Sequence, residues 1–398
     1  MFALFAFLLP LAVIALWAAK PVLIPRIRTY KRATDIRTLL NPPNLALRSL
    51  LLARATPNQR LVHAFGLTST FVSEDTKVHK TFTTSAKALI AGAGEKDRWR
   101  AVALGAEATV HRFLPAQQTV EFATFVQCVT FAVILSTLFD TDLDALHYDD
   151  LVYVTNIINQ RWKDSKIKDA AAMRQDNSLD KMMTHIDQWI VDRDRYPNPL
   201  NFILPAYETM WRVVAVTVAY VYRCRDNTLQ EAALAFGRDP TEERFQAFGE
   251  DGLQPSMQAV VLEVLRLHPP TRHIARAPVE SGSWWRTVVA PSVERADIEA
   301  VHLSEEYGEN ASEFDPMRFH PSRMGGRPAE LYSFGFGRLK CVAAAWAPMA
   351  AAVIAAKVVA QIEEAQCTVT IGPKIGGRSG WDGWAVGKET VKLLGVDA

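Results

Sequence analysis

Apolar residues recur at intervals of three and four over long stretches of the chain, a spacing that predicts amphipathic helices. These stretches are residues 84–113, 119–139, 145–165, 178–194, 205–223 and 253–267. Alternating apolar and polar positions are rare, and the strand candidates are short and late: 286–290, 299–303 and 367–371. Because no repeat or compositional break divides the chain, we expect one large domain, mainly α with a small β component.

The first residues form an uncharged run, 2–19, close to the about 20 apolar residues that cross a bilayer. Lys20 and further cations follow, which by the positive-inside rule places the rest of the chain in the cytoplasm. We predict a transmembrane anchor over 1–20, a hinge and linker over 21–57, and a folded body over 58–398. A cleaved signal peptide is the alternative, but the run lacks a positively charged beginning.

Two further stretches are free of charge, residues 122–139 and 342–356. The first carries threonine, serine and glutamine side chains, and the second is short and mostly alanine, which favours close packing against other helices. We interpret both as helices of the core. The alternative, a second membrane span over 122–139, would make the protein a multi-span one.

Composition excludes several classes of function. The 398 residues carry 44 lysines and arginines against 43 acidic residues, so a net charge of +1 offers no footprint for nucleic acid. The four cysteines are too few and too scattered for a disulfide framework or a CxxC metal site. Any cysteine chemistry must therefore come from a single thiol.

The most informative segment is 334–341, FGFGRLKC, which leads into the alanine-rich stretch. Its glycines allow the backbone to approach a bulky partner closely. Backbone dipoles at a helix start, together with Arg338 and Lys340, would favour the thiolate of Cys341 over the thiol. The segment thus predicts a thiolate ligand for iron. The alternative is an ordinary glycine turn before a helix, with an inert cysteine.

Two other segments place charges where they can support such a loop. Glu263 and Arg266 share one face of a predicted helix and can pair. Arg318 lies in a proline-punctuated loop, FDPMRF, upstream of Cys341. A buried cluster of Glu263, Arg266 and Arg318 would fasten that loop to the helix.

Together these motifs resemble those of the cytochrome P450 family. Glu263 and Arg266 match its ExxR helix, residues 316–319 its PERF-like loop, and residues 334–343 its cysteine loop. A fourth segment, PAYET over 205–209, is similar to the oxygen-activating acid–alcohol stretch of the central helix. All four occur in the family's order.

The resemblance implies haem b, bound through the thiolate of Cys341 in a catalytic domain over 58–398. The residue roles that it implies are proton delivery by Glu208 and Thr209, haem contacts by Phe334, Gly337, Arg338 and Arg276, and structural support by Glu263, Arg266 and Arg318. Two positions depart from the family pattern: Leu339 replaces an arginine or histidine that holds a haem propionate, and Ala343 replaces a glycine. Propionate binding would then fall to Arg338, Lys340 or Arg276. His79 lies in a segment similar to a haem-contacting one.

The resemblance also implies a monooxygenase of the microsomal type, similar to fungal members and to enzymes of secondary metabolism. Such an enzyme would lie in the endoplasmic reticulum membrane, receive electrons from NADPH–cytochrome P450 reductase, and oxidise a lipophilic small molecule. Two alternatives remain open. One is a haem-thiolate isomerase or dehydratase without net monooxygenation, and the other is a degenerate, non-catalytic member of the family.

Overall fold

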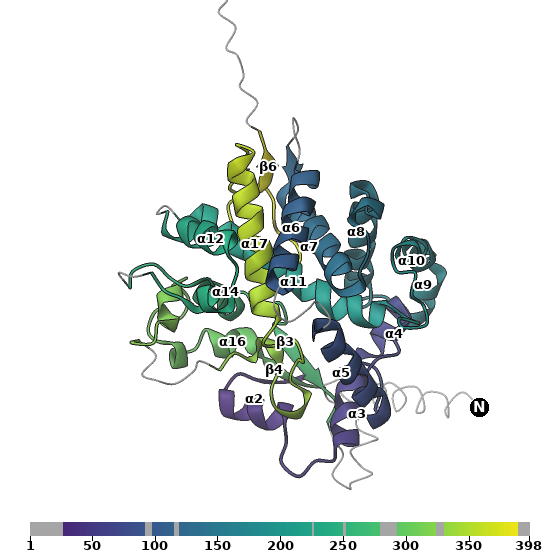
Figure 1. Cartoon of the computed structure of the whole chain (residues 1–398). Helices are drawn as coiled ribbons and strands as arrows, with labels where there is room; N and C mark the ends of the chain where they lie inside the picture. The colour runs from purple at the N-terminus through teal and green to yellow at the C-terminus, as the bar shows by residue number, and fades with distance from the viewer. Residues whose placement is uncertain are drawn as a thin grey trace, which may run out of the picture.

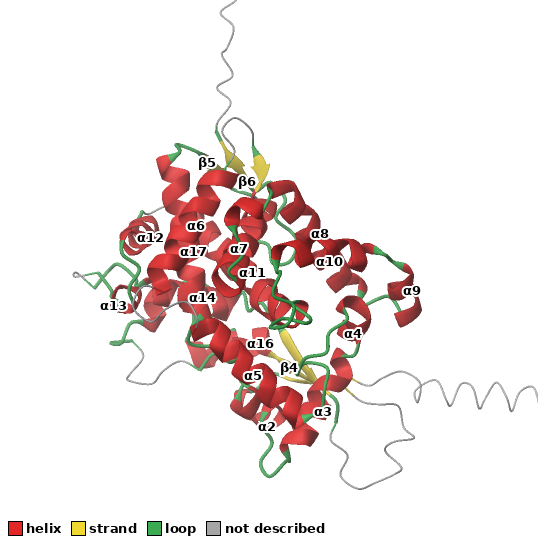
Figure 2. Ribbon diagram, turned by 45° about the vertical axis from the view of Figure 1, so that its right-hand side comes forward, coloured by secondary structure: helices red, strands yellow, loops and turns green. Residues whose placement is uncertain are grey.

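Four helices form the centre of the molecule: α6 (Arg98–Phe113), α7 (Phe122–Phe139), α11 (Leu200–Arg223) and α17 (Ala347–Glu364). They pack against one another, with α17 beside α6 and α11 beside α7 (Figure 1). The alanines over 350–356 of α17 are almost fully buried, and their small side chains let neighbouring backbones come close, as at α12, where Gly237 lies against Ala356. The expectation of a mainly helical fold is confirmed (Figure 2).

The computed structural model describes residues 27–91, 98–114, 119–224, 227–249, 252–278, 293–323 and 330–388. The other helices are α2 (Ala33–Leu40), α3 (Leu47–Asn58), α4 (Arg60–Phe65), α5 (Thr76–Ala91), α8 (Tyr148–Asp164), α9 (Ala170–Gln175), α10 (Ser178–Trp189), α12 (Thr228–Arg238), α13 (Glu242–Gln246), α14 (Met257–Leu267) and α16 (Ile298–His302). Short 3-10 turns are η1 (Leu143–Ala145), η2 (Glu305–Tyr307), η3 (Pro316–Phe319), η4 (Tyr332–Phe334) and η5 (Gly337–Leu339).

Two small sheets lie at opposite ends of the helical bundle (Figures 1 and 2). The first has the order β1 (Ile27–Tyr30), β4 (Val293–Asp297), β3 (His273–Arg276), with β1 parallel and β3 antiparallel to β4. The second has the order β2 (Val120–Glu121), β6 (Ala385–Gly387), β5 (Thr368–Thr370), all antiparallel.

The uncharged stretch 122–139 is a core helix, as expected. Within the described part of the chain, α7 and α11 are long and apolar enough to cross a membrane, but 83% and 72% of their apolar windows are buried inside the protein. Both α6 and α11 pack along α7, with Gly105 of α6 near Ser136 and Tyr207 of α11 against Phe131. The predicted anchor over 1–20 and the prolines of the hinge lie outside the described residues.

Residues 27–57, which the sequence assigned to a linker, belong to the folded body. β1 pairs with β4, and α2 buries Ile36 and Leu40 in a small core of its own against Ile298 and Val301. The apolar residues that recur at helical spacing in α2 were missed because weight was given to the cations of this segment. Among the described residues, 27–57 therefore form β1, α2 and α3 and pack with the rest of the fold.

The strand predicted over 299–303 is wrong, because these residues form most of α16. Asp297 caps this helix by accepting a hydrogen bond from the backbone N–H of Ala300, and the strand, β4, ends at Asp297. The strand predicted over 367–371 is confirmed as β5, and the one over 286–290 lies outside the described residues. The single helical stretch predicted over 84–113 is two helices, α5 and α6.

Candidate active site

The cysteine loop begins with two glycines in the left-handed backbone region, which side chains disfavour: Gly335 has φ 72° and Gly337 has φ 68°. The backbone then turns back, so that the N–H of Cys341 donates to the carbonyl of Phe334 at 2.9 Å. Cys341 is exposed, whereas Phe334 packs against the main core. The helix expected immediately after the cysteine begins only at Ala347, and residues 342–346 form turns between the two.

The pKa of the Cys341 thiol depends on burial and on a backbone group near the sulfur. Desolvation by the surrounding protein raises its pKa, and the backbone N–H of Ala343, which donates to the sulfur, lowers it in part. The sequence prediction that Arg338 would favour the thiolate is not met, because its guanidinium is engaged elsewhere. A metal ion would remove the thiol proton directly, since a coordinating thiol is deprotonated by the charge of the ion.

Arg338 and Gly337 attach the cysteine loop to the segment between α2 and α3. Arg338 donates to Asn41 Oδ1 at 3.0 Å, to the Leu45 carbonyl at 2.6 Å and to the Pro42 carbonyl at 3.3 Å. A Cβ atom at Gly337 would lie 2.3 Å from Asn41 Cβ, so only glycine allows this approach. Lys340 remains exposed beside it.

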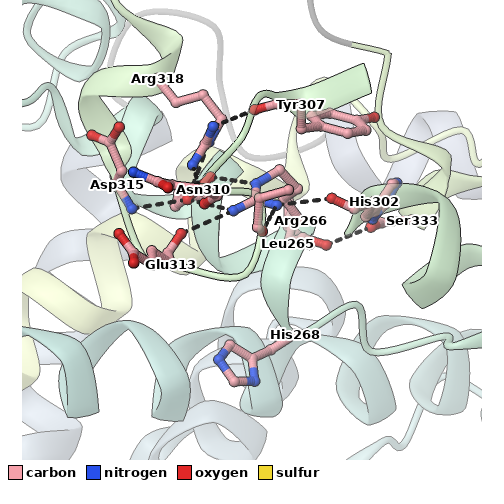
Figure 3. A network of polar contacts seen from close by, with 12 residues as sticks. Leu265, Arg266, His268, His302, Tyr307, Asn310, Glu313, Asp315, Arg318 and Ser333 are labelled. Atoms are coloured by element: carbon pink, nitrogen blue, oxygen red, sulfur yellow. Dashed lines mark hydrogen bonds and ion pairs between the residues drawn. The ribbon is translucent and has the colours of Figure 1, made fainter. Parts of the chain in front are cut away.

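Beneath the loop, α14 carries a fully buried ion pair. Arg266 binds both carboxylate oxygens of Glu263 at 2.7 Å, and neither side chain is exposed to solvent. Arg266 also donates to the backbone carbonyls of His302, Ala311 and Glu313 (Figure 3). A single arginine thus satisfies acceptors from three separate chain segments, which fixes their relative positions.

The proline-punctuated loop joins this cluster. The backbone N–H of Asp315 donates to Glu263 at 2.9 Å, and Arg318 Nε lies 3.6 Å from the same carboxylate. Arg318 also donates to the carbonyls of Tyr307 and Asn310 (Figure 3). The cysteine loop is tied to α14 through Ser333, which donates to the Leu265 carbonyl at 2.9 Å. The structure therefore brings Glu263, Arg266 and Arg318 together beside the cysteine loop.

Glu208 and Thr209 lie on α11, the central helix. Glu208 is buried and forms a two-point ion pair with Arg378, which comes from the loop between β5 and β6. Arg212, one turn later on α11, places Nη2 3.6 Å from the same carboxylate. Thr209 is half-buried, and its hydroxyl makes only a long contact of 3.4 Å to the Pro205 carbonyl. The hydroxyl of Thr209 is therefore much less constrained than the carboxylate of Glu208.

A second group of buried cations includes one residue that sequence analysis missed. Arg276, at the end of β3, and Arg54, on α3, are 7% and 8% exposed, and each has a buried Nε without a hydrogen-bond partner. The N–H of Ala277 donates to the carbonyl of Ala53, which joins the two segments. Burial lowers the pKa of Arg276 to about 10, and burial together with the charge of Arg276 lowers that of Arg54 to about 9.

His79 lies beside these two arginines. Its Nδ1 lies 2.9 Å from the hydroxyl of Thr70, and Arg54 binds the carbonyl of the same threonine. Burial, and then the charge of Arg54, lowers the pKa of His79. An unpaired buried charge destabilises the folded protein. Two buried guanidinium groups with unsatisfied donors therefore favour the binding of an anion.

Comparison with known proteins shows which family the site segment and the fold resemble. The family model for cytochrome P450 matches residues 253–363, which hold the buried ion pair and the cysteine loop. No curated protein sequence matches the chain. Solved structures that resemble it include the cytochrome P450 CYP102L1, at 15% identity and a TM-score of 0.57, covering 83% of this chain and 81% of that one.

Two further structures share the fold over nearly the whole chain. CYP154A1 from Streptomyces coelicolor A3(2) is 16% identical, with a TM-score of 0.56 and 90% of each chain covered. P450BioI, solved in complex with acyl carrier protein ligated to hexadec-9Z-enoic acid, is also 16% identical, with a TM-score of 0.55, 90% of this chain and 91% of that one. The helical fold is that of a cytochrome P450. The family model thus matches the part of the chain that holds the buried ion pair and the cysteine loop, and the fold resembles that of solved cytochromes P450 over nearly the whole chain.

The residues present fit the haem that the family typically binds. Cys341 offers a free thiol on a glycine loop, which suits an axial iron ligand. Arg54 and Arg276 offer buried, unsatisfied donors that suit the two carboxylates of the porphyrin. Arg338 does not serve this purpose in the structure, because all its contacts are with the segment between α2 and α3.

Proposed function

We propose that the protein is a membrane-anchored haem-thiolate monooxygenase. In this proposal, Cys341 binds the iron of haem b, and electrons reach it from NADPH through NADPH–cytochrome P450 reductase. The substrate is a lipophilic small molecule, consistent with a role in secondary metabolism of the fungal type. Residues 1–20 anchor the chain in the endoplasmic reticulum membrane, with the catalytic domain in the cytoplasm.

One observation carries the proposal: the sulfur of Cys341 accepts a hydrogen bond from the backbone N–H of Ala343 within a loop held to the buried Glu263–Arg266 pair. This bond partly offsets the negative charge of a thiolate, and hydrogen bonds to a sulfur ligand tune the metal that it binds. When bound, the haem supplies activation of dioxygen. The protein supplies the ligand, the position of the loop and the binding of the propionates.

The propionate positions that we propose are Arg54 and Arg276, with His79 beside them. Each guanidinium has an Nε hydrogen without an acceptor, and pairing with a carboxylate would restore the ordinary charged state that burial now disfavours. These residues would bind the propionates in place of residue 339, where the side chain of Leu339 has no hydrogen-bond donor.

On α11, we propose that Thr209 holds and passes a proton through its hydroxyl, whose long contact to Pro205 leaves it free to reorient. Glu208 is held by Arg378 and Arg212, so its carboxylate serves chiefly to position the loop that carries Arg378. On the opposite side, the reductase would meet Lys340, because Arg338 is already bound to backbone carbonyls.

The first test is the carbon monoxide difference spectrum of the reduced, membrane-expressed protein. We expect the strongly red-shifted Soret band of a thiolate-ligated ferrous complex in the wild type and in Cys367→Ala, which removes a cysteine of β5's edge. Cys341→Ala should lose that band. An unchanged spectrum in Cys341→Ala would remove the ligand assignment, and the absence of haem from folded protein would favour a non-catalytic member.

The anchor is tested separately by deleting residues 1–20. We expect the deleted protein to move from the membrane to the soluble fraction while keeping the Soret band. Persistent tight membrane association would refute a single N-terminal anchor.

A second candidate function is a haem-thiolate isomerase or dehydratase. The observation that favours it is the engagement of Glu208 in two ion pairs, which leaves one free group, Thr209, on this part of α11 for proton delivery. Turnover that continues without NADPH and reductase would support this candidate, and strict dependence on them would support monooxygenation.

A further inference from the structure

More than one positively charged side chain lies around the single carboxylate of Glu208. Arg378 binds this carboxylate at two points, and Arg212 lies 3.6 Å from it. The side chains of both arginines are 13% exposed, and that of Glu208 is 3% exposed. Two arginines therefore share one buried carboxylate, and the charge of the second is already uncompensated.

Two more cations, Arg60 at the start of α4 and Lys166 after α8, extend this group. Arg60 donates to the hydroxyl of Ser165, and among the described residues neither Arg60 nor Lys166 forms an ion pair with a carboxylate. Burial and then the charge of Arg378 lower the pKa of Arg60, and burial followed by the charges of Arg378, Arg60 and Arg212 lowers the pKa of Lys166. The carboxylate of Glu208 opposes both shifts only in part.

The indole of Trp162 holds two of these cations in place. The guanidinium carbons of Arg60 and Arg378 lie 5.0 Å and 4.9 Å from the centroid of its ring. Arg378 also donates to the side-chain oxygen of Asn159 at 3.2 Å. Stacking on Trp162 and the hydrogen bond to Ser165 fix the direction of the Arg60 guanidinium without neutralising its charge.

We define the Arg378 cluster as Arg60, Lys166, Arg212, Arg378 and Glu208, and we propose that it binds the carboxylate of the substrate. In this arrangement Arg60 and Lys166 pair with the incoming carboxylate, while Arg378 and Arg212 stay with Glu208. The inference rests on the proposed function, since it takes Thr209, next to Glu208, to face the reaction site. It narrows the substrate from a lipophilic molecule to a lipophilic acid.

The physical reason is the balance of charge. Arg212, Arg378 and the half-buried Arg60 hold like charges together in a partly desolvated place, with the exposed Lys166 at its edge. Such repulsion destabilises the folded protein, and an anion that binds there relieves it. A carboxylate suits the planar guanidinium of Arg60, as the pairing of Arg378 with Glu208 shows in the same cluster. A neutral ester or a cation of the same shape gains nothing from this field.

Calorimetric titration of the holoenzyme tests the proposal, because its signal does not depend on the haem spectrum. The probes are decanoic acid, methyl decanoate and decylamine at neutral pH, which share one hydrocarbon chain. We expect the acid to bind at least about tenfold more tightly than the ester, the ratio that one charge-assisted hydrogen bond supplies, and the amine to bind most weakly. Decyl phosphate separates a carboxylate site from a phosphate site.

Variants locate the effect within the cluster. Arg60→Gln should reduce affinity for the acid about tenfold and leave affinity for the ester unchanged, whereas Arg60→Lys should keep most of the preference. Arg48→Gln is the matched control, since the side chain of Arg48 is 73% exposed and lies outside the cluster. Arg378 is left intact, because its removal would leave Glu208 buried and unpaired.

Three results would overturn the proposal: equal affinities for acid and ester, no binding of the acid, or a preference that survives in Arg60→Gln. Tighter binding of decyl phosphate than of the acid would also overturn it. The carbon monoxide spectrum separates this failure from that of the proposed function. A red-shifted band with no preference for the acid refutes the substrate class alone, and a preference without the band refutes the haem-thiolate chemistry alone.

Discussion

The buried pair of Glu263 and Arg266 allows a quantitative prediction. Arg266→Leu keeps the apolar part of the side chain but removes the guanidinium, which leaves Glu263 as a buried carboxylate without its partner. Removing one member of a buried ion pair costs about 3–5 kcal/mol. The unfolding entropy is about 2.1 cal/mol/K per residue, so over 398 residues the midpoint of thermal unfolding should fall by about 4–6 °C.

The matched control is Arg272→Leu. Arg272 also pairs with a glutamate, Glu299, at 3.4 Å, but the two side chains are 54% and 30% exposed. An exposed pair contributes about 0–1 kcal/mol, so the midpoint should move by about 1 °C at most. Both variants and the wild type are compared by scanning calorimetry at one scan rate. If Arg266→Leu unfolds at the same temperature as Arg272→Leu, the buried pair does not stabilise the fold.

Two further predictions concern acid sensitivity and the cysteine loop. Burial lowers the pKa of His302 from 6.5 to about 4, so that on acidification the unfolded chain takes up this proton before the folded protein does. The stabilisation that the neutral imidazole contributes is complete above pH 6.5 and is lost as the pH falls toward 4. The loss amounts to about 3 kcal/mol for this residue. His302→Gln should make the thermal midpoint less dependent on pH in this window. The remaining pH dependence should come from His268, whose pKa is also lowered to about 4. The same pH dependence in the variant and in the wild type would count against the reasoning. Gly337→Ala places a Cβ 2.3 Å from Asn41 and should lower the ratio of haem to protein, whereas Gly252→Ala, with the same φ of 68° and open space around it, should leave the ratio unchanged. Equal ratios in the two glycine variants would show that the approach to Asn41 does not matter for haem binding.

The sequence predicted the helical core better than its edges. The stretch 122–139 is apolar all round its helix and contains no charge, so its burial in α7 follows from composition alone. The stretch 299–303, EAVHL, was taken as a short strand, but Asp297 supplies a helix cap just before it. The cap, a single side chain, determined the outcome over a stretch too short for periodicity to decide.

The candidate site was predicted where its residues lie in short motifs. Glu263 and Arg266 share one helix, so local spacing already places them together. Arg54 was missed because its segment was assigned to a linker, although it lies three and four positions after the buried Leu51 and Leu50, on their face of α3. Its place on an apolar face was a usable signal.

Arg378 offered no comparable signal. It lies in a glycine-rich turn, GGRS, of the kind usually found on the surface, and its partner Glu208 is 170 residues away in the sequence. Only the folding of the last residues against α11 brings the two together. Contacts between a late loop and a central helix depend on the whole chain, which local patterns do not describe.

The parallel pairing of β1 with β4 has a consequence for how the protein is made. Thr29 and Arg295, neighbours in this sheet, are 266 residues apart in the sequence. At about 5–20 residues per second, the ribosome needs roughly 13–50 s after β1 emerges before β4 exists to receive it. During that interval the edge of β1 and the apolar face of α2 have no native partner, which makes them a target for chaperones and a source of aggregation when synthesis outpaces folding.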